Sequence, residues 1–185
     1  MGCLPRRMAK SKIFPIFPPQ YIFMRKISLD STFEEYESLE SLPQADQLLV
    51  DEAKKAADDA YAPYSHFHVG AAVLLDNGKV IRGNNQEIAA YPSGLCAERV
   101  AFFATGAQHP GEKIKAIAIT AYPEGKKLPS VPVSPCGDCR QVMAEYEHRY
   151  GQNIRLIMEA GNGKYIVSES VKNLLPFLFS ADSML

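Results

Sequence analysis

Three of the four cysteines stand in two short motifs that could hold a metal ion. Cys96-Ala97-Glu98 precedes Pro135-Cys136-Gly137-Asp138-Cys139 in the chain. Cys136 and Cys139 lie about one turn apart at the start of a predicted helix, so their sulfurs can point the same way. Cys96 begins a second predicted helix. If the two helices lie side by side, three thiolates converge, and three protein ligands with one open position are typical of catalytic zinc.

Glu98 follows Cys96 closely enough to move protons at such a centre. In zinc deaminases a glutamate in this place is the general acid and base and is not a metal ligand. Zinc lowers the pKa of bound water to about 7, which makes hydroxide available at neutral pH. Two blander interpretations remain: Cys136 and Cys139 could form a redox pair or pack together by chance, and Glu98 could be a solvated helix residue.

A zinc ion with three thiolates carries a net negative charge, which weakens its pull on water. Two features could offset that charge. The N-termini of the helices that begin at Cys96 and Cys136 supply positive dipole ends. Arg99 and Arg140 could also donate hydrogen bonds to the sulfurs. Arg140 could equally be an ordinary surface arginine.

The segments that must position these motifs alternate between helical and strand patterns. Patterns of apolar residues predict helices over 44–60, 96–105, 136–150 and 170–175, and strands over 69–75, 79–82, 114–121, 154–159 and 165–167. Asn77-Gly78 and Asn162-Gly163 predict hairpin turns. The order predicts an α/β fold, a three-layer α/β/α sandwich around a five-stranded mixed sheet.

The bulk composition fits one globular domain. The chain has 185 residues, of which 46% are hydrophobic, and its formal net charge of −1 argues against a polynucleotide partner. The cysteine pattern suits a metal in a reducing compartment, so we expect a cytoplasmic protein. Prolines interrupt the apolar stretch near the N-terminus, which argues against a signal peptide or a membrane span. We expect a disordered extension over 1–24, an irregular lead-in over 25–43 and the catalytic domain over 44–180.

The motifs together resemble the homotetrameric, three-cysteine class of cytidine deaminases, from about Ala45 to Phe179. Five pieces occur in the family's order: Tyr61-Ala62-Pro63-Tyr64-Ser65-x-Phe67-x-Val69-Gly70-Ala71-Ala72, Asn85-x-Glu87, Cys96-Ala97-Glu98-Arg99, Pro135-Cys136-Gly137-x-Cys139-Arg140-Gln141 and Leu174-Leu175-Pro176.

The resemblance implies hydrolytic deamination of cytidine and deoxycytidine in pyrimidine salvage. One Zn²⁺ per subunit would be held by Cys96, Cys136 and Cys139. Glu98 would protonate ring nitrogen N3 while hydroxide attacks C4 and ammonia leaves. Arg99 would support the thiolates. The resemblance also implies a homotetramer with active sites near subunit interfaces.

The remaining expected site residues would bind the nucleoside. Alternate residues of an extended segment face one way, so Asn85 and Glu87 could grip vicinal sugar hydroxyls, and the resemblance assigns them that role. It also implies substrate contacts for a further set: Phe67 against the base, Tyr91, Ala97, and Phe179 from a neighbouring subunit, with Phe177 as an alternative. The chain departs from the family at Ile88 and Ala90, where Asn and Ser are common.

Three other functions are compatible with parts of this pattern. The same chemistry could act on another cytosine nucleoside, such as an antibiotic, or on cytosine in a polynucleotide, although Asn85 and Glu87 disfavour the latter. A non-catalytic zinc-binding protein has no need of Glu98. A thiol redox protein would form a disulfide between Cys136 and Cys139 and bind no zinc.

Overall fold

The computed structural model describes residues 24–126, 128, 129 and 131–184. The extension expected over 1–24 therefore lies, apart from Met24, outside the described residues. Among the residues described, no helix is long and apolar enough to cross a membrane.

A single mixed sheet runs through the domain in the spatial order β1-β6-β5-β4-β2-β3. Only β4 and β5 run parallel, and the other neighbours are antiparallel. The mixed sheet is confirmed, but it has six strands where the sequence predicted five. The strands are β1 (Glu34–Tyr36), β2 (Phe67–Leu75), β3 (Val80–Asn84), β4 (Ile114–Pro123), β5 (Arg155–Glu159) and β6 (Tyr165–Ser168).

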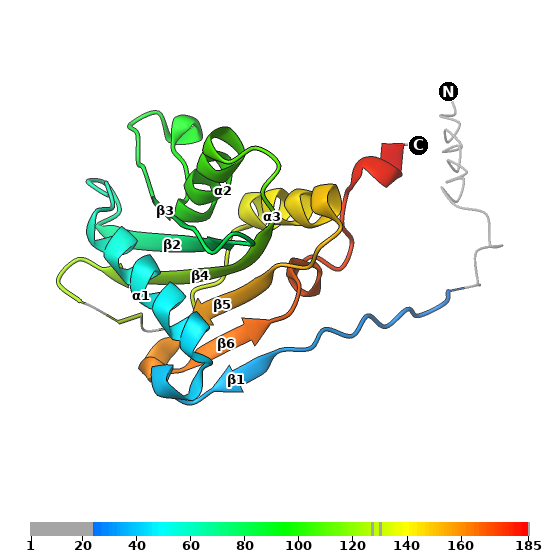
Figure 1. Ribbon diagram of the computed structural model, residues 1–185, viewed down its shortest axis with the longest axis horizontal. Coiled ribbons are helices and arrows are strands. Elements are labelled where there is room, and N and C mark those ends of the chain that lie inside the picture. Colours follow the sequence, from blue (N-terminus) through cyan, green and yellow to red (C-terminus); the bar gives the residue numbers. More distant parts are fainter. Residues whose placement is uncertain (1–23, 127, 130, 185) are drawn as a thin grey trace, which may run out of the picture.

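Helices cover both faces of this sheet, which confirms the three layers. Helix α1 (Gln44–Asp58) packs on one face, and α2 (Ala97–Gln108) and α3 (Gly137–Tyr150) pack on the other (Figure 1). One core buries α1 residues such as Leu49 against Ile157 of β5, and the second buries Phe102 and Met143 with Ile117 of β4. The last predicted helix is a short 3-10 turn, η4 (Val171–Leu174).

Two glycines let the helices approach the sheet closely. A Cβ added at Gly70 of β2 would lie 2.0 Å from the Ala53 carbonyl oxygen of α1. A Cβ added at Gly83 of β3 would lie 2.4 Å from the Ala97 carbonyl oxygen, at the start of α2. Any larger side chain at Gly83 would push the first turn of α2, and the Cys96–Glu98 motif with it, away from the sheet.

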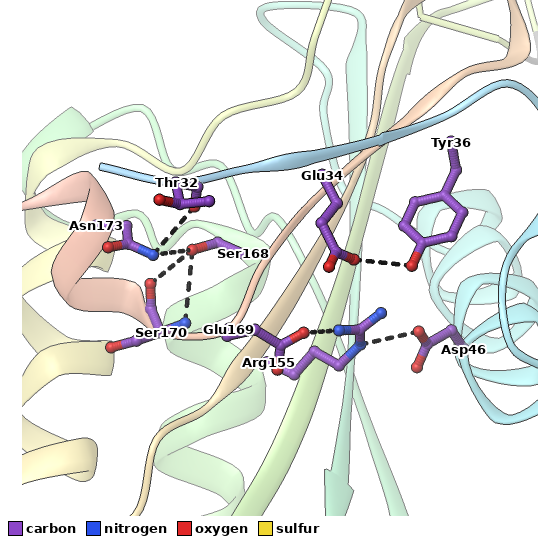
Figure 2. A network of polar contacts seen from close by, with 9 residues as sticks. All are labelled: Thr32, Glu34, Tyr36, Asp46, Arg155, Ser168, Glu169, Ser170 and Asn173. Carbon is purple, nitrogen blue, oxygen red and sulfur yellow. Dashed lines mark hydrogen bonds and ion pairs between the residues drawn. The ribbon is translucent and has the colours of Figure 1, made fainter. Parts of the chain in front are cut away.

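The lead-in over 25–43 is more ordered than the irregular segment expected. Its residues 34–36 form β1 and pair with β6, with Glu34 opposite Val167. Asn173 of η4 donates to the carbonyl of Thr32 at 3.2 Å (Figure 2). The sequence pattern missed this strand because β1 is an edge strand with mostly exposed side chains, held by its backbone rather than by an alternating apolar face.

Candidate active site

The first turns of α2 and α3 bring the two cysteine motifs together. Cys96 and Cys136 are the N-cap residues of the two helices, and Cys139 is buried in the first turn of α3. The Sγ atoms of Cys96 and Cys136 are 3.8 Å apart, and those of Cys136 and Cys139 are 3.4 Å apart. All three ligand atoms lie within 4.8 Å of one another.

This donor set fits zinc. Two sulfurs bound at about 2.3 Å with tetrahedral angles lie about 3.8 Å apart, close to the separations found here. Thiolates are soft ligands that suit zinc. Among the described residues, no fourth cysteine, histidine or carboxylate joins the group, so a coordination position would stay open.

Arg99 lies against the cysteine cluster. Its Nη2 donates to Cys96 Sγ at 3.8 Å, and its Nη1 lies 3.8 Å from an Asp138 carboxylate oxygen. The sulfur contact with Cys139 and the hydrogen bond from Arg99 lower the pKa of Cys96 to about 5. A thiol with so low a pKa is ready to act as a thiolate ligand near neutral pH.

Arg140 does not make the hydrogen bonds to sulfur that its position suggested. It donates to no sulfur in any contact found among the described residues. Instead its guanidinium donates to the carbonyl oxygens of Pro135 and Leu174 and to the Ser134 hydroxyl, at 2.8, 3.0 and 2.8 Å. Its position after Cys139 suggested sulfur, but the adjacent loop carbonyls are the nearer acceptors. Arg140 thus ties the cysteine loop to η4.

Glu98 is a buried carboxyl in the first turn of α2, only 4% exposed. Burial, and to a lesser extent the negative charge on Cys96, raise the pKa of Glu98 to about 6 in spite of hydrogen bonds that lower it. A carboxyl group whose pKa lies near neutral can both accept and donate a proton at working pH. The solvated-helix interpretation of Glu98 does not fit this burial.

A cavity of about 410 Å³ opens beside the cysteines and Glu98. Four of the predicted substrate-binding residues line it: Phe67, Asn85, Glu87 and Tyr91. Two predicted contacts, Ala97 and Phe179, are not among the described residues that line it. Ala97 is fully buried, and Phe179 is 59% exposed and bound through its carbonyl oxygen to Gln141 of α3.

Asn85 and Glu87 both hold neighbouring backbone. Asn85 accepts from the Val69 amide and donates to the Phe67 carbonyl, both at 2.9 Å. Glu87 accepts hydrogen bonds from the Tyr64 and Ser65 amides at 3.0 and 3.1 Å and from the Ser65 hydroxyl. These contacts fix the orientation of both side chains at the cavity wall.

Several cavity residues were not singled out from the sequence. Ser65 and Leu95 line the cavity, as do Val133 and Ser134 from the loop before Cys136. Ser65 stands within the quoted Tyr-Ser-x-Phe motif, so the motif itself carried a signal. The loop residues carry no local pattern, because their place depends on tertiary contacts such as the hydrogen bond from the Val133 amide to the Glu159 carbonyl at 3.0 Å. Ile88, a departure from the family pattern, also lines the cavity.

Comparisons with known proteins identify the family of this chain. A family model for the cytidine and deoxycytidylate deaminase zinc-binding region matches residues 43–150. A cytidine deaminase from Sporosarcina psychrophila is 42% identical over 137 residues, which are 74% of this chain and 92% of that protein. One from Halalkalibacterium halodurans is 42% identical over 139 residues, which are 75% and 96% of the two chains.

The solved structure of a cytidine deaminase from Burkholderia pseudomallei has 40% sequence identity and a TM-score of 0.62. The match covers 71% of this chain and 97% of that one. The family match extends over more than half of the chain and includes all three cysteines and Glu98. This chain therefore belongs to the cytidine and deoxycytidylate deaminase family.

Proposed function

We propose that this protein is a zinc-dependent hydrolase that deaminates cytidine and deoxycytidine to uridine and deoxyuridine, with release of ammonia, in pyrimidine salvage. The observation that carries the proposal is the convergence of three cysteine sulfurs beside buried Glu98 at one cavity. The reaction replaces the amino group at C4 of the cytosine ring by an oxygen from water.

Glu98 is the proton carrier of this reaction. Cys96, Cys136 and Cys139 would hold a zinc ion, which when bound would supply Lewis-acid activation of water. Glu98 accepts a proton from the water and donates one to N3 of the ring, which makes C4 more electrophilic. Once the water oxygen has bonded to C4, Glu98 takes the remaining proton of that oxygen and delivers it to the amino group, so the C4–N bond breaks and ammonia leaves as the C4 carbonyl forms. One carboxyl can serve each step because its pKa of about 6 lies near neutral pH.

The remaining cavity residues hold the nucleoside. Asn85 and Glu87 bind the sugar hydroxyls, Phe67 packs against the base, and Tyr91 closes the wall beside Glu87. Ala97 binds the nucleoside through its backbone amide, since the first amide groups of a helix have no hydrogen-bond partner within the helix. The cavity volume lies in the usual range for small-molecule sites.

A homotetramer with sites near the subunit interfaces accounts for the C-terminal aromatic residues. Phe177 and Phe179 are 82% and 59% exposed, although large apolar side chains are costly to leave in water. We assign to Phe179 the contact with a neighbouring subunit's substrate. The three free thiols of the metal centre suit a reducing compartment, so we place the enzyme in the cytoplasm.

Ammonia release tests the proposed function directly. The zinc-loaded protein is mixed separately with cytidine, deoxycytidine, cytosine, a cytosine nucleoside antibiotic and single-stranded DNA, and Glu98→Gln serves as the inactive control. We expect release from the two nucleosides, and a loss of about 10²–10⁴-fold in kcat for the variant. No ammonia from either nucleoside at full zinc loading would contradict the proposal. Sedimentation tests the tetramer separately, and a monomer would rule it out.

A further inference from the structure

Ser65 connects two residues that line the cavity through one hydroxyl group. It lies in the turn before β2 and lines the cavity itself. Its Oγ donates to a carboxylate oxygen of Glu87 and accepts from the Phe67 amide at 3.1 Å. Because one hydroxyl contacts both Glu87 and the Phe67 backbone, Ser65 links the expected sugar-binding residue to the expected base-packing residue.

The turn that carries Ser65 is held in an unusual conformation. The next residue, His66, has a φ of 53°, a region that non-glycine residues seldom adopt. The His66 amide donates to the Ala62 carbonyl at 3.1 Å, and the Glu124 amide donates to the His66 carbonyl at 2.8 Å. His66 Nδ1 also lies 2.8 Å from Glu124 Oε2. Such conformations persist where the surroundings fix them, and they gather at functional sites.

This turn aims three donors at one carboxylate. The Tyr64 amide, the Ser65 amide and the Ser65 hydroxyl all donate to Glu87. A carboxylate offers about four acceptor positions, so one remains for a ligand hydroxyl. The hydrogen bond from Ser65 lowers the pKa of Glu87, which keeps the group charged. A side chain that is already oriented loses less conformational entropy when a ligand binds.

We propose that Ser65 is a positioning residue for the sugar of the substrate: its hydroxyl holds the Glu87 carboxylate in the orientation that binds a sugar hydroxyl and ties it to the backbone of Phe67. This inference rests on the proposed function. Ser65 acts on binding through Glu87 and takes no part in the proton transfers of Glu98. Its loss therefore weakens binding of the nucleoside and leaves the chemical step intact.

The experiment is a double-mutant cycle on the zinc-loaded enzyme with Ser65→Ala, Glu87→Ala and the combined variant. We expect Ser65→Ala to raise KM for cytidine about 10-fold, as for loss of a hydrogen bond to a charged group, with kcat within about twofold. In the Glu87→Ala background the same change should have no further effect. Ser65→Thr, which keeps the hydroxyl, should restore KM.

The sugar gives a second readout. With 2′,3′-dideoxycytidine, which lacks the hydroxyls that Glu87 would bind, Ser65→Ala should leave KM unchanged. Ser93→Ala, in an exposed turn near the cavity, is the matched control and should behave like the wild type. Thermal melting checks that each variant folds. If Ser65→Ala does not fold, Ser65→Gly replaces it in the double-mutant cycle.

Three results would overturn the inference: an unchanged KM in Ser65→Ala, additive effects in the cycle, or an equal effect on the dideoxynucleoside. Each of these leaves the proposed function standing if the wild type deaminates cytidine. A wild-type enzyme that acts on neither cytidine nor deoxycytidine would contradict the proposed function and, with it, the role of Ser65.

Discussion

The cysteine centre and the β1 edge both join distant parts of the chain, but they do so with different groups. At the cysteine centre, side chains from α2 and α3 meet, and their chemical identity decides what the centre can bind. At the edge, backbone meets backbone along β1 and β6, and Asn173 binds the Thr32 carbonyl (Figure 2). The first region should tolerate almost no substitution, whereas the second should tolerate most substitutions but not removal.

The charged side chains of the two regions also differ in how far they are buried. Near the cysteines, Glu98 is buried and Arg99 is mostly so, which makes their charges sensitive to each neighbour. At the edge, Lys164 lies 3.2 Å from Glu35 and 3.0 Å from Glu37, with both acidic side chains more than half exposed. Exposed pairs of this kind contribute at most about 1 kcal/mol each. The edge therefore depends on its backbone pairing for stability.

Replacing a cysteine should have the largest effect. Cys139→Ala removes a fully buried ligand atom, so we expect the purified protein to hold almost no zinc. Activity should fall by more than the roughly 10–100-fold typical of losing a group that only supports a ligand. Metal analysis and ammonia release measure both effects, and chelation of the wild type should reproduce them. A variant that keeps its zinc would mean that Cys139 is not a ligand.

Replacing Arg99 should have an intermediate effect on the same centre. Arg99→Gln removes the hydrogen bond to Cys96 Sγ and a positive charge, so zinc affinity should drop about 10–100-fold. Competition with a chromogenic chelator measures the affinity. Arg149→Gln, at an exposed position of α3, is the matched control and should bind zinc like the wild type. Equal affinities in the two variants would remove Arg99 from the metal centre.

Removing the β1 edge should affect stability rather than chemistry. Deletion of residues 1–36 uncovers the backbone of β6, and an open edge strand promotes aggregation. We expect a lower Tm, and more aggregate in light scattering, with kcat/KM within about twofold of the wild type. A large loss of kcat/KM in the soluble fraction would show that the two regions are coupled.

A single substitution at the edge should have the smallest effect. Asn173→Ala removes side-chain hydrogen bonds to the Thr32 carbonyl and the Ser168 hydroxyl. Hydrogen bonds contribute about 0.5–1.5 kcal/mol each, which corresponds to a fall in Tm of a few degrees for a chain of this size. Thermal melting measures the shift, and kcat/KM should not change. A Tm equal to that of the wild type would mean that this link contributes nothing.

Local patterns predicted most of the elements because each was fixed by residues close together in the chain. The helices predicted over 44–60, 96–105 and 136–150 are confirmed with shifts of up to three residues at their ends. The turns around Gly78 and Asn162 are present, with the positive φ angles that these residue types tolerate. β1 escaped prediction, since an exposed edge strand has no apolar face to recognise.

The sequence by itself determined which residue types stand in the two motifs, three cysteines and Glu98, and the spacing of Cys136 and Cys139, because one helical turn sets that spacing locally. Only the tertiary structure decided that Cys96 joins them, that Arg99 contacts sulfur while Arg140 binds carbonyls, and that Ser65 meets Glu87. Each of these contacts depends on how helices sit on the sheet. Gly83, where any Cβ would collide with the first turn of α2, shows how narrowly that placement is set.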